Sequence, residues 1–172
     1  MRSPTPSSQH LFEPDSPLGR LLATPLRPGR LVWIGLRVVR RDAIEAVNEA
    51  LLDPAAGLVG DRYAGRSGIR QVTLLQEEHR AAIGAYLGQP PVTCARLRRN
   101  LVVAGLNLLA AREGRLRVGA AVLEVTGLCH PCSRMEEELG QGGYNAVRGH
   151  GGLTARVIEG GLVRLGDAVV RL

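Results

Sequence analysis

An eight-residue pattern occurs twice in the second half of this chain, and it constrains the fold more than any other feature. Leu116–Leu123 and Val163–Val170 share the order x-Arg-apolar-Gly-x-Ala-Val-apolar, at an offset of 47 residues. In each copy a glycine separates two apolar runs that are too short for helices, which predicts a strand, a glycine turn and a second strand. Two copies are too few for a solenoid, which needs about three or more repeats. We therefore expect two β-hairpins.

Other short apolar runs also favour strands, namely Leu31–Val39, Ile69–Gln76 and Leu101–Val103. Ile44–Leu52 fits both a helix and a strand by spacing, and in these surroundings we favour the strand. Glu77–Leu87 predicts an amphipathic helix, on which we expect a histidine at position 79 to be exposed. Many short strands and a few helices predict a mainly β fold of the α+β type, a closed or nearly closed β-barrel with appended helices.

The length of 172 residues suits one domain with a substantial core, since a chain of about 150 residues buries roughly 68 to 70% of its unfolded surface. Residues 1–29 contain six prolines and several serines, which disfavour helix interiors and central strands. We expect residues 1–29 to form an arm and residues 30–172 to form the barrel domain.

All 22 cationic residues are arginine, and the formal net charge is +6. Such a balance suits nucleic acid, so an arginine-driven nucleic-acid binder is one alternative. The aromatic residues are scattered along the sequence, however, and predict no base-stacking platform, so we do not favour this alternative. Without lysine the chain can form no Schiff base with pyridoxal phosphate and no Walker A phosphate site.

The sequence contains three cysteines, no N-terminal segment resembling a signal peptide and no apolar run of about 18 residues that would span a membrane. An odd number of cysteines does not indicate a disulfide framework. We expect a soluble protein of the reducing cytoplasm, without a membrane partner.

Two cysteines lie in the sequence Cys129-His130-Pro131-Cys132, between an apolar run and the residues Ser133–Leu139. The acidic residues of the latter segment favour a helix N-terminus, so the cysteines are predicted on a strand-to-helix turn. A thiol there lies close to the helix end, to His130 and to Arg134, all of which favour a thiolate. Cys132 is nearest the helix and is the candidate reactive atom.

The pair admits three interpretations. A zinc site needs further ligands, for which Cys94, His130 and His150 are the candidates, without finger-like spacing. A thiol-disulfide module has the expected turn, but the chain lacks the alternating βαβ pattern of thioredoxin-like proteins. A single thiolate on Cys132, carrying a persulfide or binding a soft metal such as molybdenum, needs only cationic surroundings and an anionic partner.

Two glycine-rich segments are candidate ligand loops. Residues 57–68 contain Arg62, and residues 140–152 contain Arg148 and His150. Glycine lets the backbone approach a ligand closely, and arginine offers paired donors to an anion. A mobile surface loop has the same composition, so this alternative stays open.

Five motifs, in order, resemble the MOSC family, the molybdenum cofactor sulfurase C-terminal domain. They are Gly-Leu-Val-Gly-Asp-Arg-Tyr at 57–63, Arg-Gln-Val-Thr-Leu-Leu-Gln at 70–76, Arg-Arg-Asn-Leu-Val-Val-Ala-Gly at 98–105, Arg-Val-Gly-Ala-Ala-Val-Leu-Glu-Val-Thr at 117–126, and Pro-Cys at 131–132. The resemblance runs from about Leu31 to the C-terminus. It implies a β-barrel-rich fold, binding of a molybdenum-pterin cofactor, sulfur transfer and, in some members, reduction of N-hydroxylated compounds.

The resemblance also implies site residues. Cys132 would be the sulfur carrier or molybdenum ligand, and Arg70 and Asn100 would lie at the site. From their charge we infer that Arg62, Arg99 and Arg148 are candidates for the anionic pterin phosphate. Because the chain has no lysine, a persulfide would come from a separate cysteine desulfurase. Cys129 departs from the family pattern, and we take it as a small apolar residue or a resolving thiol.

Overall fold

The computed structural model describes residues 15–62 and 68–172 of the chain. Within them the strands are β1 Gly29–Leu36, β2 Glu45–Val47, β3 Glu49–Asp53, β4 Gly57–Leu58, β5 Val72–Gln76, β6 Leu101–Ala104, β7 Arg115–Val118, β8 Ala121–Leu128, β9 Leu153–Glu159, β10 Gly161–Arg164 and β11 Ala168–Arg171. The helices are α1 Pro17–Leu22, α2 His79–Tyr86, α3 Cys94–Leu97, α4 Ser133–Leu139 and α5 Gly143–Val147. The segment that fitted both a helix and a strand thus forms strands β2 and β3.

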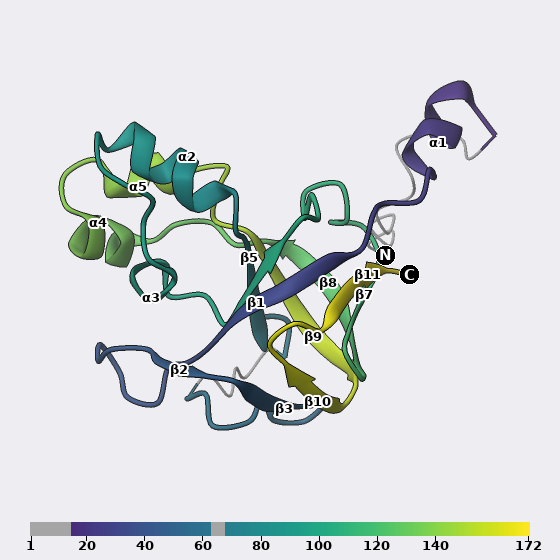
Figure 1. Cartoon of the computed structure of the whole chain (residues 1–172), viewed down its shortest axis with the longest axis horizontal. Helices are drawn as coiled ribbons and strands as arrows, with labels where there is room; N and C mark the ends of the chain where they lie inside the picture. Colours follow the sequence, from purple (N-terminus) through teal and green to yellow (C-terminus); the bar gives the residue numbers. More distant parts are fainter. Residues whose placement is uncertain (1–14, 63–67) are drawn as a thin grey trace, which may run out of the picture.

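Seven strands close into a barrel in the order β11-β7-β8-β9-β5-β6-β1, because β1 also pairs with β11. Neighbours in this ring are antiparallel except β5 and β6, which are parallel. β2 extends the sheet from β1, while β10, β3 and β4 form a small second sheet, at the bottom of Figure 1. The predicted mainly β fold with a closed barrel is confirmed.

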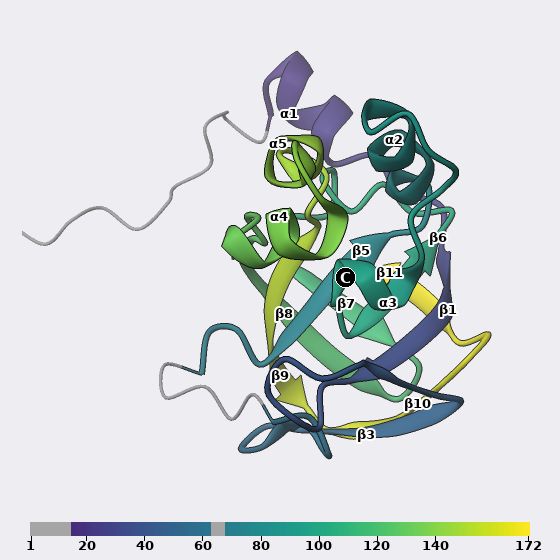
Figure 2. The same ribbon diagram turned by 90° about the vertical axis from the view of Figure 1, so that its left-hand side faces the viewer.

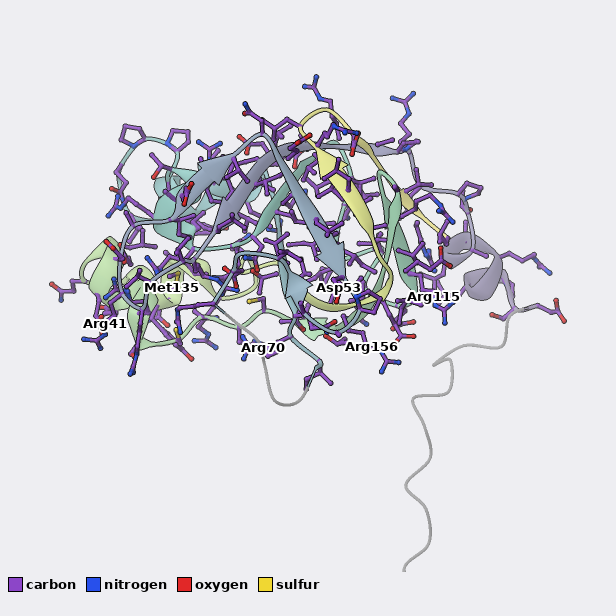
Figure 3. All side chains as sticks on the ribbon, turned by 90° about the horizontal axis from the view of Figure 1, so that it is seen from below. Arg41, Asp53, Arg70, Arg115, Met135 and Arg156 are labelled. Carbon is purple, nitrogen blue, oxygen red and sulfur yellow. The ribbon has the colours of Figure 1, made fainter. Side chains whose placement is uncertain are left out.

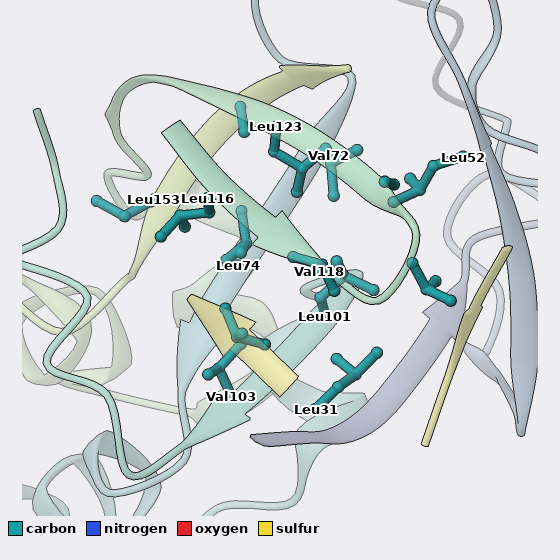
Figure 4. Packing of buried hydrophobic residues seen from close by; sticks show 14 of the residues in the cluster. Leu31, Leu52, Val72, Leu74, Leu101, Val103, Leu116, Val118, Leu123 and Leu153 are labelled. Carbon is teal, nitrogen blue, oxygen red and sulfur yellow. The ribbon is translucent and has the colours of Figure 1, made fainter. Parts of the chain in front are cut away.

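The parallel strands β5 and β6 are buried on both faces. Leu74 packs inside the barrel, as Figure 4 shows, whereas the next residue, Leu75, packs under the helices. Leu101 and Val103 likewise belong to the barrel core. Val102, between them, belongs with Leu75 to a second buried cluster beneath the helices, which we call the helix-side cluster. Successive side chains of a strand point to opposite faces, so a strand covered on both sides reads as a continuous apolar run.

Of the two predicted hairpins only the first exists. In the first copy β7 pairs with β8, with Val118 opposite Ala121. In the second copy β10 pairs with β3 and β11 pairs with β7 and β1, so the two strands lie in different sheets. In the turn between them, the backbone N–H of Leu165 donates to the carbonyl of Asn48, and that of Gly166 donates to the carbonyl of Leu31 in β1. The prediction of a second hairpin was therefore wrong.

Helices α2, α3, α4 and α5 gather at one end of the barrel, as Figures 1 and 2 show together. They cover the helix-side cluster described above, to which Ile83, Met135 and Val147 contribute. Helix α1 projects separately from the barrel (Figure 1), within the segment expected to be an arm. Its Pro17 is in the first turn, where a proline costs no hydrogen bond, and the hydroxyl of Ser16 accepts the N–H of Gly19.

Candidate functional site

Cys132 lies in the connection between β8 and α4. β8 ends at Leu128 and Cys132 is the residue directly before the helix, so the predicted strand-to-helix connection is confirmed. The backbone of Cys132 is extended, with φ −129° and ψ 177°, and the residue is exposed. Cys129 is only 4% exposed, and its N–H donates to the carbonyl of Gly152. Of these two thiols, that of Cys132 is the one open to solvent.

Cys132 borders a pocket of about 660 Å³, a size typical of small-molecule sites. Figure 3 labels Arg70 and Met135, which line this pocket from the segment before β5 and from α4. Six arginines contribute to the lining: Arg37, Arg62, Arg70, Arg98, Arg99 and Arg134. The described lining residues include no carboxylate. A concave surface with walls of one charge raises the local concentration of counter-ions, so this arginine pocket suits an anion.

Arg99 is anchored at the back of the arginine pocket and is 6% exposed. Its Nε donates to the carbonyl of Gly151 at 2.8 Å, and its Nη1 donates to the carbonyl of Leu97 at 2.7 Å. Burial lowers the pKa of its guanidinium, and the nearby Cys129 and Cys132 sulfurs act in the opposite direction. Both hydrogen bonds go to neutral carbonyls, so neither of them neutralises the charge of Arg99, which lines the same pocket as Cys129 and Cys132.

Gly151 allows this close packing. A Cβ at this position would lie 2.0 Å from the carbonyl oxygen of Cys129 and 3.3 Å from Nη2 of Arg99. Only a residue without a side chain lets the glycine-rich segment 140–152 pass so close to the cysteine connection. The segment therefore helps to shape the pocket through its backbone.

Arg70 lies in the turn before β5, not in the strand as predicted, because β5 begins at Val72. From there its Nη2 donates to Sγ of Cys129 across 3.9 Å. Arg62 also lines the pocket, and its backbone N–H donates to the carbonyl of Arg37. The structure thus brings Arg62, Arg70 and Arg99 together around the two cysteines.

Asn100 is fully buried and lies behind the arginine pocket without lining it. Its Oδ1 accepts the N–H and the hydroxyl of Thr73 and also Nη2 of Arg37 at 3.0 Å, and its Nδ2 donates to the carbonyl of Gly35. Arg37 in turn makes a two-point ion pair with the carboxylate of Asp61. The structure therefore places Asn100 as a residue that positions Arg37 and joins β1 to β5.

Arg98 and Arg134 share the carboxylate of Glu138. The distance from this carboxylate to Arg98 is 3.6 Å, and the distance to Arg134 is 2.6 Å. Arg98 has a left-handed backbone, with φ 56°, which is uncommon for a residue with a side chain. Burial lowers the pKa of Arg98, Glu138 raises it, and the cations Arg134, Arg37 and Arg62 lower it further. This crowding of cations would be relieved by a bound anion.

Two predicted site residues lie elsewhere. Arg148 and His150 line a second hollow, together with Tyr86, and do not line the arginine pocket. His79, expected to be an exposed helix residue, is half-buried instead and packs edge-on against His150 at a centroid distance of 4.7 Å. That expectation was wrong because α2 packs against α5 and the segment that follows it.

Sequence reasoning did not place Arg37 or Arg98 at the site. Arg98 carried a usable signal, because it is the first residue of the Arg-Arg-Asn motif. Arg37 carried none, since it follows β1 and reaches the pocket only through the closure of the barrel.

The alternatives for the cysteine pair gain no support from the geometry. Residues 15–62 and 68–172 contain no cluster of three or more His, Cys, Asp or Glu side chains suited to a metal ion. Cys129 and Cys132 are both free thiols, and no turn hydrogen bond among the described residues joins them. The extended backbone at Cys132 differs from a compact dithiol turn, in which the two sulfurs must approach closely.

Fold and site together define a class: a closed β-barrel with an exposed cysteine beside a cationic pocket for a small molecule. Residues 60–170 match the model of the MOSC domain, and the chain belongs to the MOSC domain family. Among curated proteins none matches the sequence.

Solved structures agree with this fold. The chain is similar to the YuaD protein of Bacillus subtilis, with 18% identity, a TM-score of 0.73, and coverage of 83% of this chain and 94% of that one. It is also similar to YiiM from Escherichia coli, with 20% identity, a TM-score of 0.64 and coverage of 83% and 69%. For YiiM from Geobacillus stearothermophilus the identity is 17%, the TM-score 0.67 and the coverage 84% and 75%.

In the described part of the chain, no helix has the length and apolar character needed to cross a membrane.

Proposed function

We propose that this MOSC protein handles sulfur or molybdenum through Cys132, while the arginine pocket holds an anionic pterin cofactor. The observation that carries the proposal is the exposed thiol of Cys132 on the rim of a pocket lined by six arginines. A thiolate is both a nucleophile toward sulfur and a soft ligand for a metal. The arginines supply the positive charge that a thiolate and an anionic ligand both need.

A molybdenum-pterin cofactor, which membership of the family implies, fits the residues present. The pocket of about 660 Å³ is within the range for cofactor sites, and Cys132 offers one accessible soft donor atom. Cys132 would ligate the molybdenum, and Arg62, Arg70 and Arg99 would bind the phosphate by charge-assisted hydrogen bonds. When bound, the group would supply electron-transfer chemistry at the metal.

For sulfur transfer, the thiolate of Cys132 attacks the outer sulfur of a donor cysteine persulfide. A sulfur–sulfur bond forms at Cys132 while the donor's sulfur–sulfur bond breaks, and the donor cysteine leaves as a thiolate. The exchange needs no external oxidant or reductant. Arg99, which lines the same pocket as Cys132, stabilises the negative charge of the attacking thiolate and of the new persulfide.

The sulfur donor in this proposal is a separate protein. A cysteine desulfurase works through pyridoxal phosphate bound to a lysine, and this chain has none. The exposure of Cys132, in contrast to the burial of Cys129, lets a protein-bound persulfide reach it.

The test combines metal analysis of freshly purified anaerobic protein with intact mass after incubation with a cysteine desulfurase and free cysteine. Wild-type protein, Cys132→Ser and Cys94→Ser are compared. Cys94 is the matched control because it lies on α3 outside the pocket, and burial raises the pKa of its thiol. We expect bound molybdenum, or a mass gain of one sulfur atom, in the wild type and in Cys94→Ser but not in Cys132→Ser.

Folded wild-type protein that shows neither molybdenum nor the mass gain contradicts the proposal. A gain that persists in Cys132→Ser contradicts the assignment of the sulfur to Cys132. The role of the pocket is tested with Arg70→Gln, which should lower molybdenum content or the rate of sulfur loading. Arg156→Gln serves as the control, because Arg156 pairs with Glu124 on the barrel surface away from the pocket.

A further inference from the structure

A second hollow of about 600 Å³ lies between α2 and α5, where Figures 1 and 2 show these helices at the same end of the barrel. It shares no lining residue with the arginine pocket. Its walls include Tyr86 at the end of α2, Asn145 on α5, and Arg148 and His150 after α5. The function proposed for Cys132 uses none of these residues.

One wall of this hollow is aromatic. The ring of Tyr86 lies 5.3 Å from that of His150, tilted by 46°, and His79 packs edge-on behind His150. Tyr86 is 64% exposed, so one face of its ring is open. Tyr86 and His150 thus form a small aromatic surface, with His79 packed behind it.

The imidazole of His150 lines this wall, and that of His79 packs against it from outside the hollow. Their Nδ1 atoms are buried and have no hydrogen-bond partner among the described residues. Burial, and then the neighbouring His150, lower the pKa of His79.

The positive charge of the hollow comes from Arg148, which is exposed and whose Nη1 bonds only weakly to Asn145, at 3.4 Å. The amides of Asn145 and Gln141 add donors and acceptors to the lining, and the described lining residues include no carboxylate. The hollow therefore combines a stacking surface, amide groups and one guanidinium within the size range of small-molecule sites.

We propose that this hollow is a second ligand site, for a nucleoside monophosphate. The base stacks on the open face of Tyr86 beside His150, and the amides of Asn145 and Gln141 hydrogen-bond to its edge. Arg148 pairs with the phosphate, since a guanidinium matches phosphate oxygens at two points. Stacking is tolerant of the base, so affinity depends on the aromatic ring and the phosphate more than on base identity.

The test is isothermal titration of the full chain with AMP, with adenosine and inorganic phosphate as separate probes. We expect saturable AMP binding with a Kd below about 1 mM, and weaker binding of each of the other two probes. Tyr86→Ala should weaken AMP binding by about tenfold or more, the range for one stacked base, and Arg148→Gln should bring the affinity for AMP down to that for adenosine.

Two control variants test whether the loss of AMP affinity is specific to residues that line this hollow. Tyr144→Ala removes another exposed tyrosine on α5 that does not line the hollow, and Arg62→Gln removes a cation of the arginine pocket. Both should leave the affinity for AMP unchanged. The proposal is overturned by the absence of saturable AMP binding, by equal losses in the two tyrosine variants, or by a loss in Arg62→Gln that matches or exceeds that in Arg148→Gln. None of these outcomes depends on whether Cys132 carries sulfur.

Discussion

Replacing Asn100 by alanine should test whether a buried amide holds the arginine pocket in place. The side chain makes four hydrogen bonds, two from Thr73 and one from Arg37 to its Oδ1, and one from its Nδ2 to the carbonyl of Gly35. In Asn100→Ala the hydroxyl of Thr73 keeps the backbone N–H of residue 100 as a partner, and Arg37 keeps Asp61. The backbone N–H of Thr73 and the carbonyl of Gly35 lose the side chain of Asn100 as their hydrogen-bond partner.

Each buried polar group left without a partner costs about 1 to 3 kcal/mol, so the free energy of unfolding should fall by about 2 to 6 kcal/mol. That is a large share of the roughly 5 to 15 kcal/mol that stabilises a typical domain. Urea unfolding followed by the fluorescence of Trp33, the single tryptophan of the chain, measures the change.

The matched control is Asn107→Ala. Asn107 is exposed, and its side-chain oxygen accepts the backbone N–H groups of Leu109 and Ala110 in its own turn, so its loss should cost about 1 kcal/mol. If Asn100→Ala does not fold, Thr73→Val removes one hydroxyl at nearly constant volume and should cost about 1 to 3 kcal/mol. A cost below about 1 kcal/mol for Asn100→Ala would refute the reasoning, because water or local rearrangement would then satisfy the N–H of Thr73 and the carbonyl of Gly35.

Three further predictions follow from the same contacts. Iodoacetamide should modify Cys132 before Cys94, because only the former is exposed; peptide mass spectrometry gives the order, and equal rates would contradict it. Gly151→Ala should destabilise the protein more than Gly149→Ala in urea unfolding. A Cβ at position 151 would meet a backbone oxygen at 2.0 Å, whereas a Cβ at position 149 would meet nothing within 4 Å and would cost only the strain of its φ of 78°, about 1 to 2 kcal/mol. The backbone N–H groups of Tyr144 and Gly142 lower the pKa of Glu136, so this carboxylate stabilises the fold above its ordinary pKa of 4.5, and the effect is lost as the pH falls below that value. The difference in stability between wild type and Glu136→Gln should therefore shrink between pH ~7 and pH ~3, and a constant difference would contradict this assignment.

The place of Cys132 between a strand and a helix could be predicted from the sequence because its signals are local. A short apolar run, a Pro-Cys pair and an acidic segment that begins a helix all lie between residues 121 and 139, and Cys132 lies in the strand-to-helix connection that they predict. The barrel was predicted in the same way, from the number and length of strands. Register and partner choice were not, which is why the second hairpin prediction failed although both of its strands exist.

The arginines also separate what the sequence predicts from what depends on tertiary packing. Arg62, Arg70 and Arg99 come from different parts of the chain and line one pocket. Arg148 and His150 have equally suggestive glycine-rich neighbours, yet they line another hollow. Composition marks a segment as able to approach a ligand, but the direction in which it faces depends on the packing of α5 against α2.

The sequence by itself determined a mainly β domain with a cysteine in a strand-to-helix connection, because strand length, turn residues and helix starts depend on neighbours along the chain. Only the tertiary structure decided which arginines surround Cys132, that Asn100 supports the pocket from behind, and that Tyr86 packs against His150 with His79 behind it. These contacts join residues far apart in sequence through barrel closure and helix packing, and such pairings leave no mark in the local pattern of any one segment.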